Sequence, residues 1–368
     1  MIAMESPSAS RACKVDRALF GCLGDGTEIE RITLSNGKGI SASIITYGAT
    51  LQALMMPDWA GRVVDITLGH DQLEPYVERP RYFGVTVGRY ANRIAGGRLV
   101  IDNRTYPLAV NDGANTLHGG GRGFDTQVWT VASVETGDVA SVGLTLHSPD
   151  GDAGFPGALD ARVTYTLSEQ GDLSILFEAK TDKPTVVNMT NHAIFNLAGE
   201  GAPQGTSDHV LMIAAGRFTP VDASLIPTGF LKSVDKTVFD FRRPCQVAKG
   251  IRNGQDAQIR FGRGYDHNFV LDEGLTEFPK LAARLEDPAS GRVLEVLTTE
   301  PGIQLYTGNS LDGTLPGKQG HLYRAGDGIA LEPQKFPDSP NQSGFPSARL
   351  DPNKPYRHLM IYRLSVKP

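Results

Sequence analysis

Three stretches of this chain alternate apolar and polar side chains with a period of two residues. The alternation runs through residues 141–146 and 162–167, and a third stretch, 173–177, follows a turn at 169–172. Because successive side chains of a β-strand point to opposite faces, this pattern is typical of strands with one buried face. The pattern predicts that these stretches form β-strands of an antiparallel sheet.

The rest of the chain offers little that could form long helices. The best helical candidate is short, residues 71–79, and the apolar stretches 281–285 and 293–297 flank a turn at 287–291, which predicts a hairpin. Glycine and proline, 42 and 23 residues, punctuate short apolar segments throughout. We therefore predict an all-β protein, a large antiparallel β-sandwich.

The chain has 368 residues, and large all-β units of this size can form one domain. Residues 1–18, rich in Ser, Ala and charge, are predicted to be a flexible tail, and residues 19–368 a single domain. We find no apolar signal segment at the N-terminus and no run of about 18 apolar residues, so we expect neither a leader nor a membrane span.

Composition limits the partners. The formal net charge is −5 with no basic block, which argues against nucleic acid and is compatible with a neutral polar ligand. Cys13, Cys22 and Cys245 show no Cys-x-x-Cys spacing, so we expect no disulfide framework and no cysteine zinc site. The reducing cytoplasm is the predicted location.

The first functional candidate is His192, which lies among asparagines and Thr190 in an otherwise apolar run, 187–197. Histidine has an unperturbed pKa of about 6.5, so it can give and take protons near neutral pH. A single histidine in a strand is more often structural. The interpretation therefore depends on other polar residues set in apolar or glycine-rich surroundings.

Three such places stand out. Asn92 and Arg93 could grip vicinal hydroxyls or a carboxylate, although an arginine at a strand end is often only a surface residue. His118 lies at the mouth of a glycine-rich loop, where backbone can approach a ligand, unless the loop is a plain turn. Asp266 could accept hydrogen bonds from hydroxyl groups, or could simply be a turn residue.

Glu332 follows an apolar segment and should be partly enclosed, which would raise its pKa toward that of a working general base. Pro333 indicates a strand end or edge there. We expect no metal site, because His-Glu-x-x-His is absent and the neighbours Asp266 and His267 would point to opposite faces of a strand. A Gly-x-Ser-x-Gly elbow, which a serine hydrolase of that type needs, is also absent.

Taken together in their order, the motifs of the chain resemble the aldose 1-epimerase, or galactose mutarotase, family from about residue 20 to residue 364. The resemblance rests on short sequences: Asn-Arg at 92–93, Leu-His-Gly-Gly at 117–120, Ser-Pro-Asp-Gly at 148–151, Gly-Phe-Pro-Gly at 154–157, Thr-Asn-His at 190–192, Phe-Asn-Leu at 195–197, Leu-Ile-Pro-Thr-Gly at 225–229, Gly-Tyr-Asp-His-Asn at 264–268, Thr-Glu-Pro-Gly-Ile-Gln at 299–304, Leu-Glu at 331–332 and Phe-Pro-Asp at 336–338.

The resemblance implies a β-sandwich with a sugar cleft, no cofactor, and interconversion of the α and β anomers of a free aldose such as galactose, glucose or xylose. It implies Glu332 as general base, His192 as acid and His118 as a second catalytic histidine. Residues that bind substrate would be Asn92, Arg93, His118, Asp266 and Gln304. A monosaccharide is the expected partner, and the expected assembly is a monomer or a homodimer.

One departure from the family pattern lies beside the acid. Ala193 and Ile194 stand where the family commonly has a serine and an aromatic residue, so the resemblance leaves the sugar preference open, with a pentose preference or a wider cleft as the alternatives.

Two alternatives use the same fold. A hexose-6-phosphate mutarotase would need cations aimed at the phosphate, for which Arg89, Arg93, Arg98 and Arg122 are the candidates. A non-catalytic sugar-binding protein would have lost the acid or the base, whereas this sequence has both.

Overall fold

The three alternating stretches form adjacent antiparallel strands in a computed structural model that describes residues 13–367. They are β12 (Val139–Ser148), β13 (Leu159–Ser168) and β14 (Asp172–Thr181). Residues of β13 and β14 alternate between fully buried and partly exposed positions along most of their length. The strand predictions for this part of the chain are therefore confirmed.

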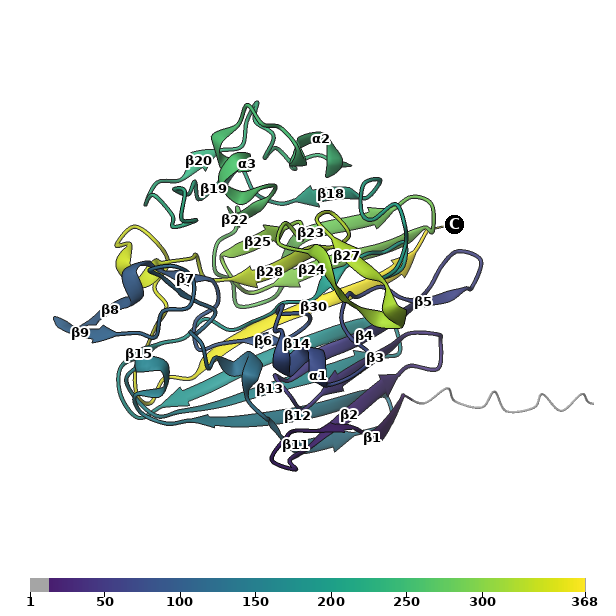
Figure 1. Cartoon of the computed structure of the whole chain (residues 1–368), viewed down its shortest axis with the longest axis horizontal. Coiled ribbons are helices and arrows are strands. Elements are labelled where there is room, and N and C mark those ends of the chain that lie inside the picture. Colours follow the sequence, from purple (N-terminus) through teal and green to yellow (C-terminus); the bar gives the residue numbers. More distant parts are fainter. Residues whose placement is uncertain (1–12, 368) are drawn as a thin grey trace, which may run out of the picture.

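These strands belong to a nine-stranded antiparallel sheet with the order β11-β12-β13-β14-β30-β24-β23-β18-β21 (Figure 1). The predicted hairpin is confirmed as β23 and β24, and the last long strand, β30, lies between β14 and β24. The bounds of the six further strands are β11 (Thr130–Glu135), β18 (Val210–Ile213), β21 (Cys245–Gln246), β23 (Lys280–Asp287), β24 (Arg292–Thr298) and β30 (Tyr356–Val366).

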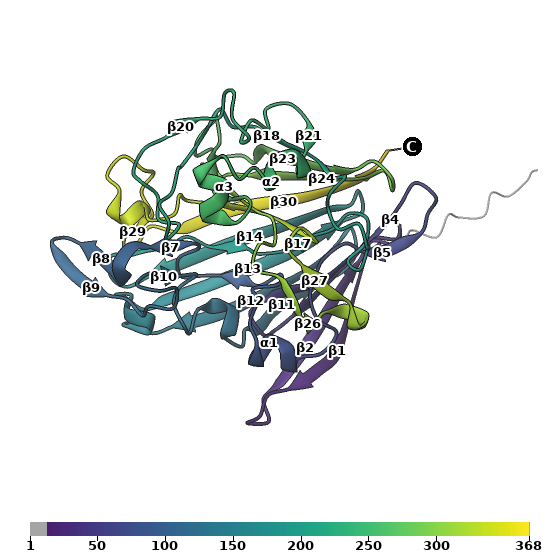
Figure 2. The ribbon, with the colours of Figure 1, turned by 45° about the horizontal axis from the view of Figure 1, so that its top comes forward.

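A second sheet has five strands in sequence order: β1 (Lys14–Cys22), β2 (Glu28–Ser35), β3 (Ser41–Ile45), β4 (Thr50–Pro57) and β5 (Val63–Asp65). Strands β1 and β2 lie beside β11 and β12, and a bridge joins Cys13 to Gly137 (Figure 2). The predicted tail boundary at residue 18 is thus wrong, since β1 already begins at Lys14. Residues 1–12 of that predicted tail lie outside the described residues.

A third sheet has six strands in the order β17-β28-β25-β22-β19-β20. Its members are β17 (Ile194–Phe195), β19 (Arg217–Phe218), β20 (Lys232–Ser233), β22 (Asp266–Val270), β25 (Gly302–Tyr306) and β28 (Ile329–Gln334). One continuous cluster of buried side chains draws on all three sheets, for example Ile32 of β2, Phe177 of β14 and Leu331 of β28. The main core therefore lies between the nine-stranded sheet and the other two, as in a β-sandwich.

The remaining strands are two to five residues long and form two-stranded pairs. They are β6 (Thr86–Val87) with β16 (Thr190–Asn191), β7 (Arg93–Ile94) with β10 (Thr116–Leu117), β8 (Arg98–Ile101) with β9 (Arg104–Pro107), β15 (Thr185–Val186) with β29 (Arg349–Leu350), and β26 (Asp312–Pro316) with β27 (Leu322–Arg324). Every ladder in these sheets and pairs is antiparallel, which confirms the predicted fold class.

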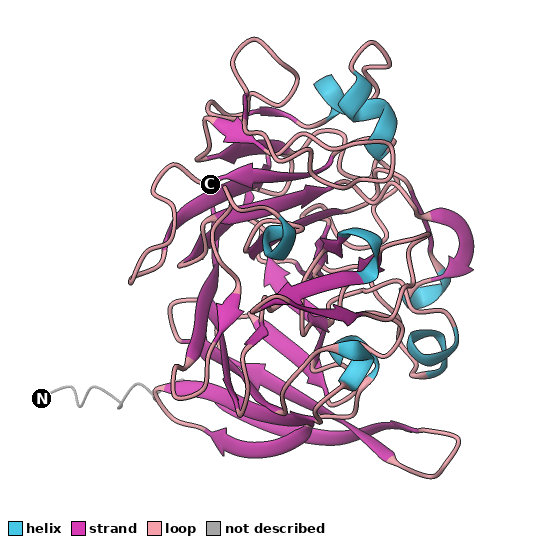
Figure 3. Ribbon diagram, turned by 90° about the vertical axis from the view of Figure 1, so that its left-hand side faces the viewer, coloured by secondary structure: helices cyan, strands magenta, loops and turns pink. Residues whose placement is uncertain are grey.

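Helices are short and peripheral (Figure 3). They are α1 (Glu74–Glu78), which lies inside the predicted 71–79 segment, α2 (Ala248–Ile251) and α3 (Ala257–Gly262). Five single 3₁₀ turns complete the set, at Ala95–Gly97, Phe124–Thr126, Asp152–Gly154, Lys318–Gly320 and Ser339–Asn341. Within residues 13–367, no helix has the length and apolar character needed to cross a membrane.

Candidate active site

A polar row crosses the face of the six-stranded sheet that is turned away from the main core. Asp266 of β22, Gln304 of β25 and Glu332 of β28 all line one cavity. Gln304 is paired with Glu332 across the ladder, whereas Ile303 and Leu331, the residues before them, pack into the main core. The period-two geometry of the strands thus places apolar and polar residues on opposite faces.

The two histidines come from irregular segments above this row. His192 lies between β16 and β17, and His118 follows β10 with a φ of +52°. The backbone N–H of Asn92 donates to Nδ1 of His118 at 3.2 Å, so a neutral His118 carries its proton on Nε2. The structure places all seven predicted site residues around one cavity of about 250 Å³: Asn92, Arg93, His118, His192, Asp266, Gln304 and Glu332.

Glu332 and His192 face each other across the base of the cavity. Oε1 of Glu332 lies 3.6 Å from Nε2 of His192, and the two side chains are only 2% and 7% exposed. Glu332 Oε2 and His192 Nδ1 have no hydrogen-bond partner within the described chain. Catalytic hydrogen bonds in a site without ligand are often long, and this spacing fits an acid–base pair.

Burial favours the neutral form of both groups. Burial, and then the carboxylate of Asp266, raises the pKa of Glu332 well above its usual value, while the guanidinium of Arg93 opposes the rise. Burial lowers the pKa of His192 to about 4. His118 has a pKa well below its usual value, because it is buried and lies beside His192 and Arg93. At neutral pH His118 is therefore a neutral hydrogen-bond donor.

Arg93 lies close to two carboxylates, those of Asp112 and Asp266, in the wall of the cavity. Its Nε lies 2.7 Å from Oδ2 of Asp112, and its Nη1 lies 4.0 Å from Oδ2 of Asp266. Asp266 also accepts a 2.6 Å hydrogen bond from Nε2 of Gln304. Burial raises the pKa of Asp266, and Arg93 and Gln304 act against this rise. The wall therefore presents fixed donors and acceptors, which suits a ligand rich in hydroxyl groups.

Several cavity residues escaped the sequence reasoning: Arg81, Tyr82, Asp112, Leu225, Phe261, Arg263, Tyr306, Asn309 and Ser310. Tyr306 had a usable signal, because it stands two residues after Gln304 in the same strand and so shares its face. The others come from loops and from α3, where no periodicity indicates which side chains point inward.

The structure places Ala193 and Ile194 away from the cavity, and their effect on sugar preference stays a prediction. Both are buried in hydrophobic clusters, Ala193 in the main core and Ile194 in a second cluster with Leu68 and Phe83. Neither lines the cavity. The residues that differ from the family pattern therefore have no direct contact with the space available to a ligand.

The arginine cluster expected for a phosphate is only partly present. Arg89 is 2% exposed and donates to Ser148 and to four backbone carbonyls, so its guanidinium supports loops. Arg98 and Arg122 are exposed and do not line the cavity. Of the four candidates only Arg93 does, although Arg81 and Arg263, which the sequence reasoning missed, also line it.

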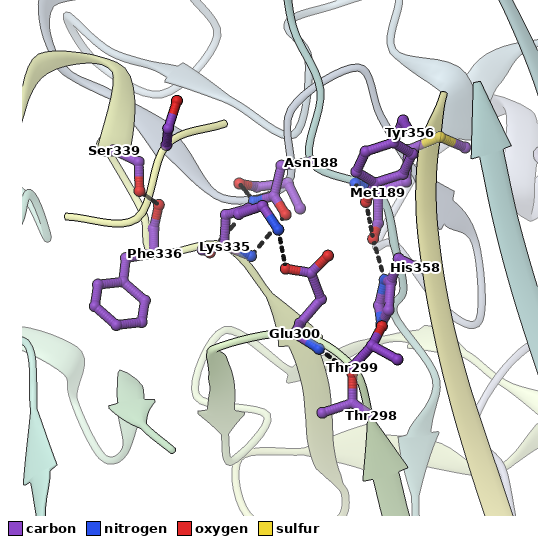
Figure 4. A network of polar contacts seen from close by, with 12 residues as sticks. Asn188, Met189, Thr298, Thr299, Glu300, Lys335, Phe336, Ser339, Tyr356 and His358 are labelled. Carbon is purple, nitrogen blue, oxygen red and sulfur yellow. Dashed lines mark hydrogen bonds and ion pairs between the residues drawn. The ribbon is translucent and has the colours of Figure 1, made fainter. Parts of the chain in front are cut away.

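A buried polar network ties the active-site segments together behind the cavity (Figure 4). The side chain of Asn188 accepts a hydrogen bond from the backbone N–H of Lys335 and donates to the carbonyls of Ala91 and Lys335. Nζ of Lys335 lies 2.6 Å from Oε2 of Glu300, a residue with no exposed surface. The network thus joins three segments that carry site residues: the segment just before His192, the segment just before Arg93 and the segment just after Glu332.

The same network reaches β30 through His358 (Figure 4). Nδ1 of His358 lies 2.9 Å from the carbonyl oxygen of Met189, so this nitrogen carries the proton. Nε2 then accepts from the hydroxyl of Thr298 at 3.0 Å, and the same hydroxyl oxygen accepts from the backbone N–H of Glu300. These contacts position the chain that carries His192 against the nine-stranded sheet.

Within residues 13–367, no group of three or more His, Cys, Asp or Glu side chains is arranged to hold a metal ion. The cysteines Cys13, Cys22 and Cys245 are all free.

The family model described as "Aldose 1-epimerase" matches residues 30–363. A mouse protein named "Galactose mutarotase" is 45% identical over 354 residues, covering 96% of this chain and 99% of its own. "Aldose 1-epimerase" of Escherichia coli K12 is 38% identical, covering 92% and 96%. The crystal structure of galactose 1-epimerase from Lactobacillus acidophilus NCFM superposes with a TM-score of 0.85 at 30% identity, covering 96% and 99%. From its motifs, its sandwich and these matches over nearly the whole length, we conclude that this chain belongs to the aldose 1-epimerase family.

Proposed function

We propose that this protein is an aldose 1-epimerase that interconverts the α and β anomers of free aldoses such as galactose, glucose or xylose. The observation that carries the proposal is the buried Glu332–His192 pair, 3.6 Å apart, at the base of a cavity lined with hydroxyl-binding groups. Relatives named galactose mutarotase that are about as long as this chain support the same activity.

The reaction opens the sugar ring and closes it on the other face. Glu332 takes the proton from the anomeric hydroxyl while His192 gives one to the ring oxygen, and the bond between the anomeric carbon and the ring oxygen breaks. The bond that joins the aldehyde carbon to the rest of the sugar then rotates by half a turn. Closure reverses both proton transfers, so each residue returns to its first state.

The pair needs only one shared proton for this chemistry. With that proton on His192, Glu332 is the base and His192 the acid; with the proton on Glu332, the roles exchange. Burial favours the neutral pair, in which Glu332 holds the proton, and transfer of that proton to His192 gives the arrangement in which Glu332 is the base. Each positioned proton-transfer group typically contributes about 10²–10⁴ to the rate.

The surrounding residues bind and orient the sugar. His118, a neutral donor through Nε2, lies next to His192 and would bind oxygen atoms near the reacting end. Asn92, Arg93, Asp266 and Gln304 would bind the remaining hydroxyl groups, which holds the ring in a reactive geometry. No step requires a cofactor. The predicted cytoplasmic location is part of the proposal, and the three free cysteines support it.

The test is polarimetry on freshly dissolved α-D-galactose, α-D-glucose and α-D-xylose with the parent protein and with Glu332→Gln. We expect the parent to speed the approach to the same final rotation, and the variant to lose about two to four orders of magnitude in turnover. The control is Glu178→Gln, because Glu178 lies on the outer face of β14, away from the cavity. Near-parent turnover in Glu332→Gln would remove Glu332 from the mechanism.

A second candidate substrate class has one supporting observation. Arg81 and Arg263 line the cavity, and the guanidinium of Arg263 makes no ion pair within the described chain. A phosphorylated or carboxylated aldose would give this cation a partner. The test is to measure kcat/KM for galactose 6-phosphate and for galactose. A higher kcat/KM for the phosphorylated sugar, and loss of this difference in Arg263→Met, would favour a hexose-6-phosphate mutarotase.

A further inference from the structure

Tyr82 is an aromatic residue of the cavity that lies outside every motif of the sequence analysis. It lies in the loop between α1 and β6 and lines the same cavity as the two histidines. The centroid of its ring lies 4.7 Å from that of His118 and 5.8 Å from that of His192. Because the two imidazoles are themselves 5.3 Å apart, the three rings form one packed group.

The backbone of Tyr82 is held in an unfavourable conformation. Its φ is +60°, in the left-handed region that bulky side chains avoid. Nearby contacts enforce this geometry: the N–H of Gly84 donates to the carbonyl of His192 at 2.9 Å, and the side chain of Asn191 donates to the carbonyl of Gly84 at 2.7 Å. Such strain is concentrated at functional sites.

The hydroxyl of Tyr82 has no hydrogen-bond partner among the described residues. Two other tyrosines use their hydroxyls internally: Tyr90 donates to the carbonyl of Phe336, and Tyr306 of the cavity pairs with Ser310. Within residues 13–367, the Tyr82 hydroxyl makes no hydrogen bond. Burial raises its pKa, as do the carboxylates of Asp125 and Asp112, so the hydroxyl keeps its proton at neutral pH.

We propose that Tyr82 is a substrate-binding residue whose hydroxyl donates a hydrogen bond to a hydroxyl group of a sugar bound in the cavity that Tyr82, His118 and His192 line. The ring, packed on both imidazoles, keeps them in the orientation that the reaction needs. This inference rests on the proposed function, since it assumes a sugar in the cavity.

The test compares Tyr82→Phe, which removes only the hydroxyl, with the parent protein. The matched control is Tyr106→Phe, because Tyr106 of β9 lies outside the cavity and its ring stacks with Arg104 at 4.9 Å. Affinity for D-galactose is measured by calorimetry and kcat/KM by polarimetry. Both are repeated with galactose analogues that each lack one hydroxyl.

We expect Tyr82→Phe to weaken galactose binding by roughly threefold to tenfold, the usual worth of one hydrogen bond. For one analogue, the one without the contacted hydroxyl, the parent and the variant should bind equally. Tyr82→Leu, which also removes the ring, should lower kcat further than Tyr82→Phe does. Tyr106→Phe should match the parent throughout.

Two results would overturn the inference: galactose binding as tight in Tyr82→Phe as in the parent, or the same loss with every sugar of the panel. A parent protein that neither binds galactose nor speeds its mutarotation would refute the proposed function, and the role of Tyr82 with it. An active parent with an unaffected Tyr82→Phe variant would refute the role of Tyr82 alone.

Discussion

Replacing Lys335 by methionine would test how much the protein depends on the buried ion pair behind the active site. Nζ of Lys335 lies 2.6 Å from Oε2 of Glu300, and the side chains are 10% and 0% exposed. Glu300 Oε1 already has no partner within the described chain. The substitution therefore leaves a carboxylate in the interior without its charged neighbour, which typically costs about 3–5 kcal/mol.

The free energy of unfolding of most domains is only about 5–15 kcal/mol, so the substitution would remove a large part of it. It would lower the midpoint of thermal unfolding by roughly 4–6 °C, because the unfolding entropy of a chain of this length is about 0.8 kcal/mol/K. The double variant Glu300→Gln/Lys335→Met removes the charge as well, and should recover about 2 kcal/mol of the loss. Because the backbone N–H of Lys335 still donates to Asn188, turnover of the folded variant should stay close to that of the parent.

The assay is urea unfolding followed by circular dichroism for the parent, both variants and a surface control. In the control, Lys367→Met, the lost partner is Glu286 at 2.8 Å, and the Lys367 side chain is 53% exposed, so we expect a change of only about 0–1 kcal/mol. The reasoning is refuted if Lys335→Met costs no more than this control, or if the double variant is as unstable as the single one.

Three further substitutions test other parts of the site. Asp266→Asn removes a carboxylate that raises the pKa of Glu332. The acid limb of the pH profile of kcat/KM should therefore move to lower pH. An acid limb that stays in place or moves to higher pH would contradict Glu332 as the titrating base. His192→Asn should reduce turnover by about 10²–10⁴ in polarimetry, whereas normal turnover would shift the acid role to His118. Ile194→Val should cost about 0.5–1.5 kcal/mol of stability and leave the ranking of galactose, glucose and xylose unchanged, since Ile194 lies in the core; a changed ranking would show that it reaches the sugar after all.

Some errors of the sequence reasoning have a clear physical cause. The predicted tail, residues 1–18, includes the beginning of β1 (Lys14–Cys22), because β1 is an edge strand whose side chains are mostly exposed, so no alternation marks it. Ala193 and Ile194 follow His192 in the sequence but do not line the cavity, because in this irregular segment neighbouring side chains point in different directions. From the sequence, Arg89 is a plausible cation for a phosphate. In the structure, however, its guanidinium is buried and donates hydrogen bonds to Ser148.

The sequence alone was enough for the fold class, because period-two alternation between turns has few other solutions than antiparallel sheets, and β12, β13 and β14 lie where the alternation predicts. Its motifs, through the family resemblance, also named seven of the residues that line the cavity. Only the tertiary structure decided that Glu332 and His192, which are far apart in the chain, lie 3.6 Å from each other, and that burial brings both toward the neutral form. It alone revealed that Tyr82 packs against both histidines and that Glu300 and Lys335 form a buried ion pair. The reason is physical: alternation is a local property of the backbone, whereas distances, burial and pKa values depend on which distant segments pack together.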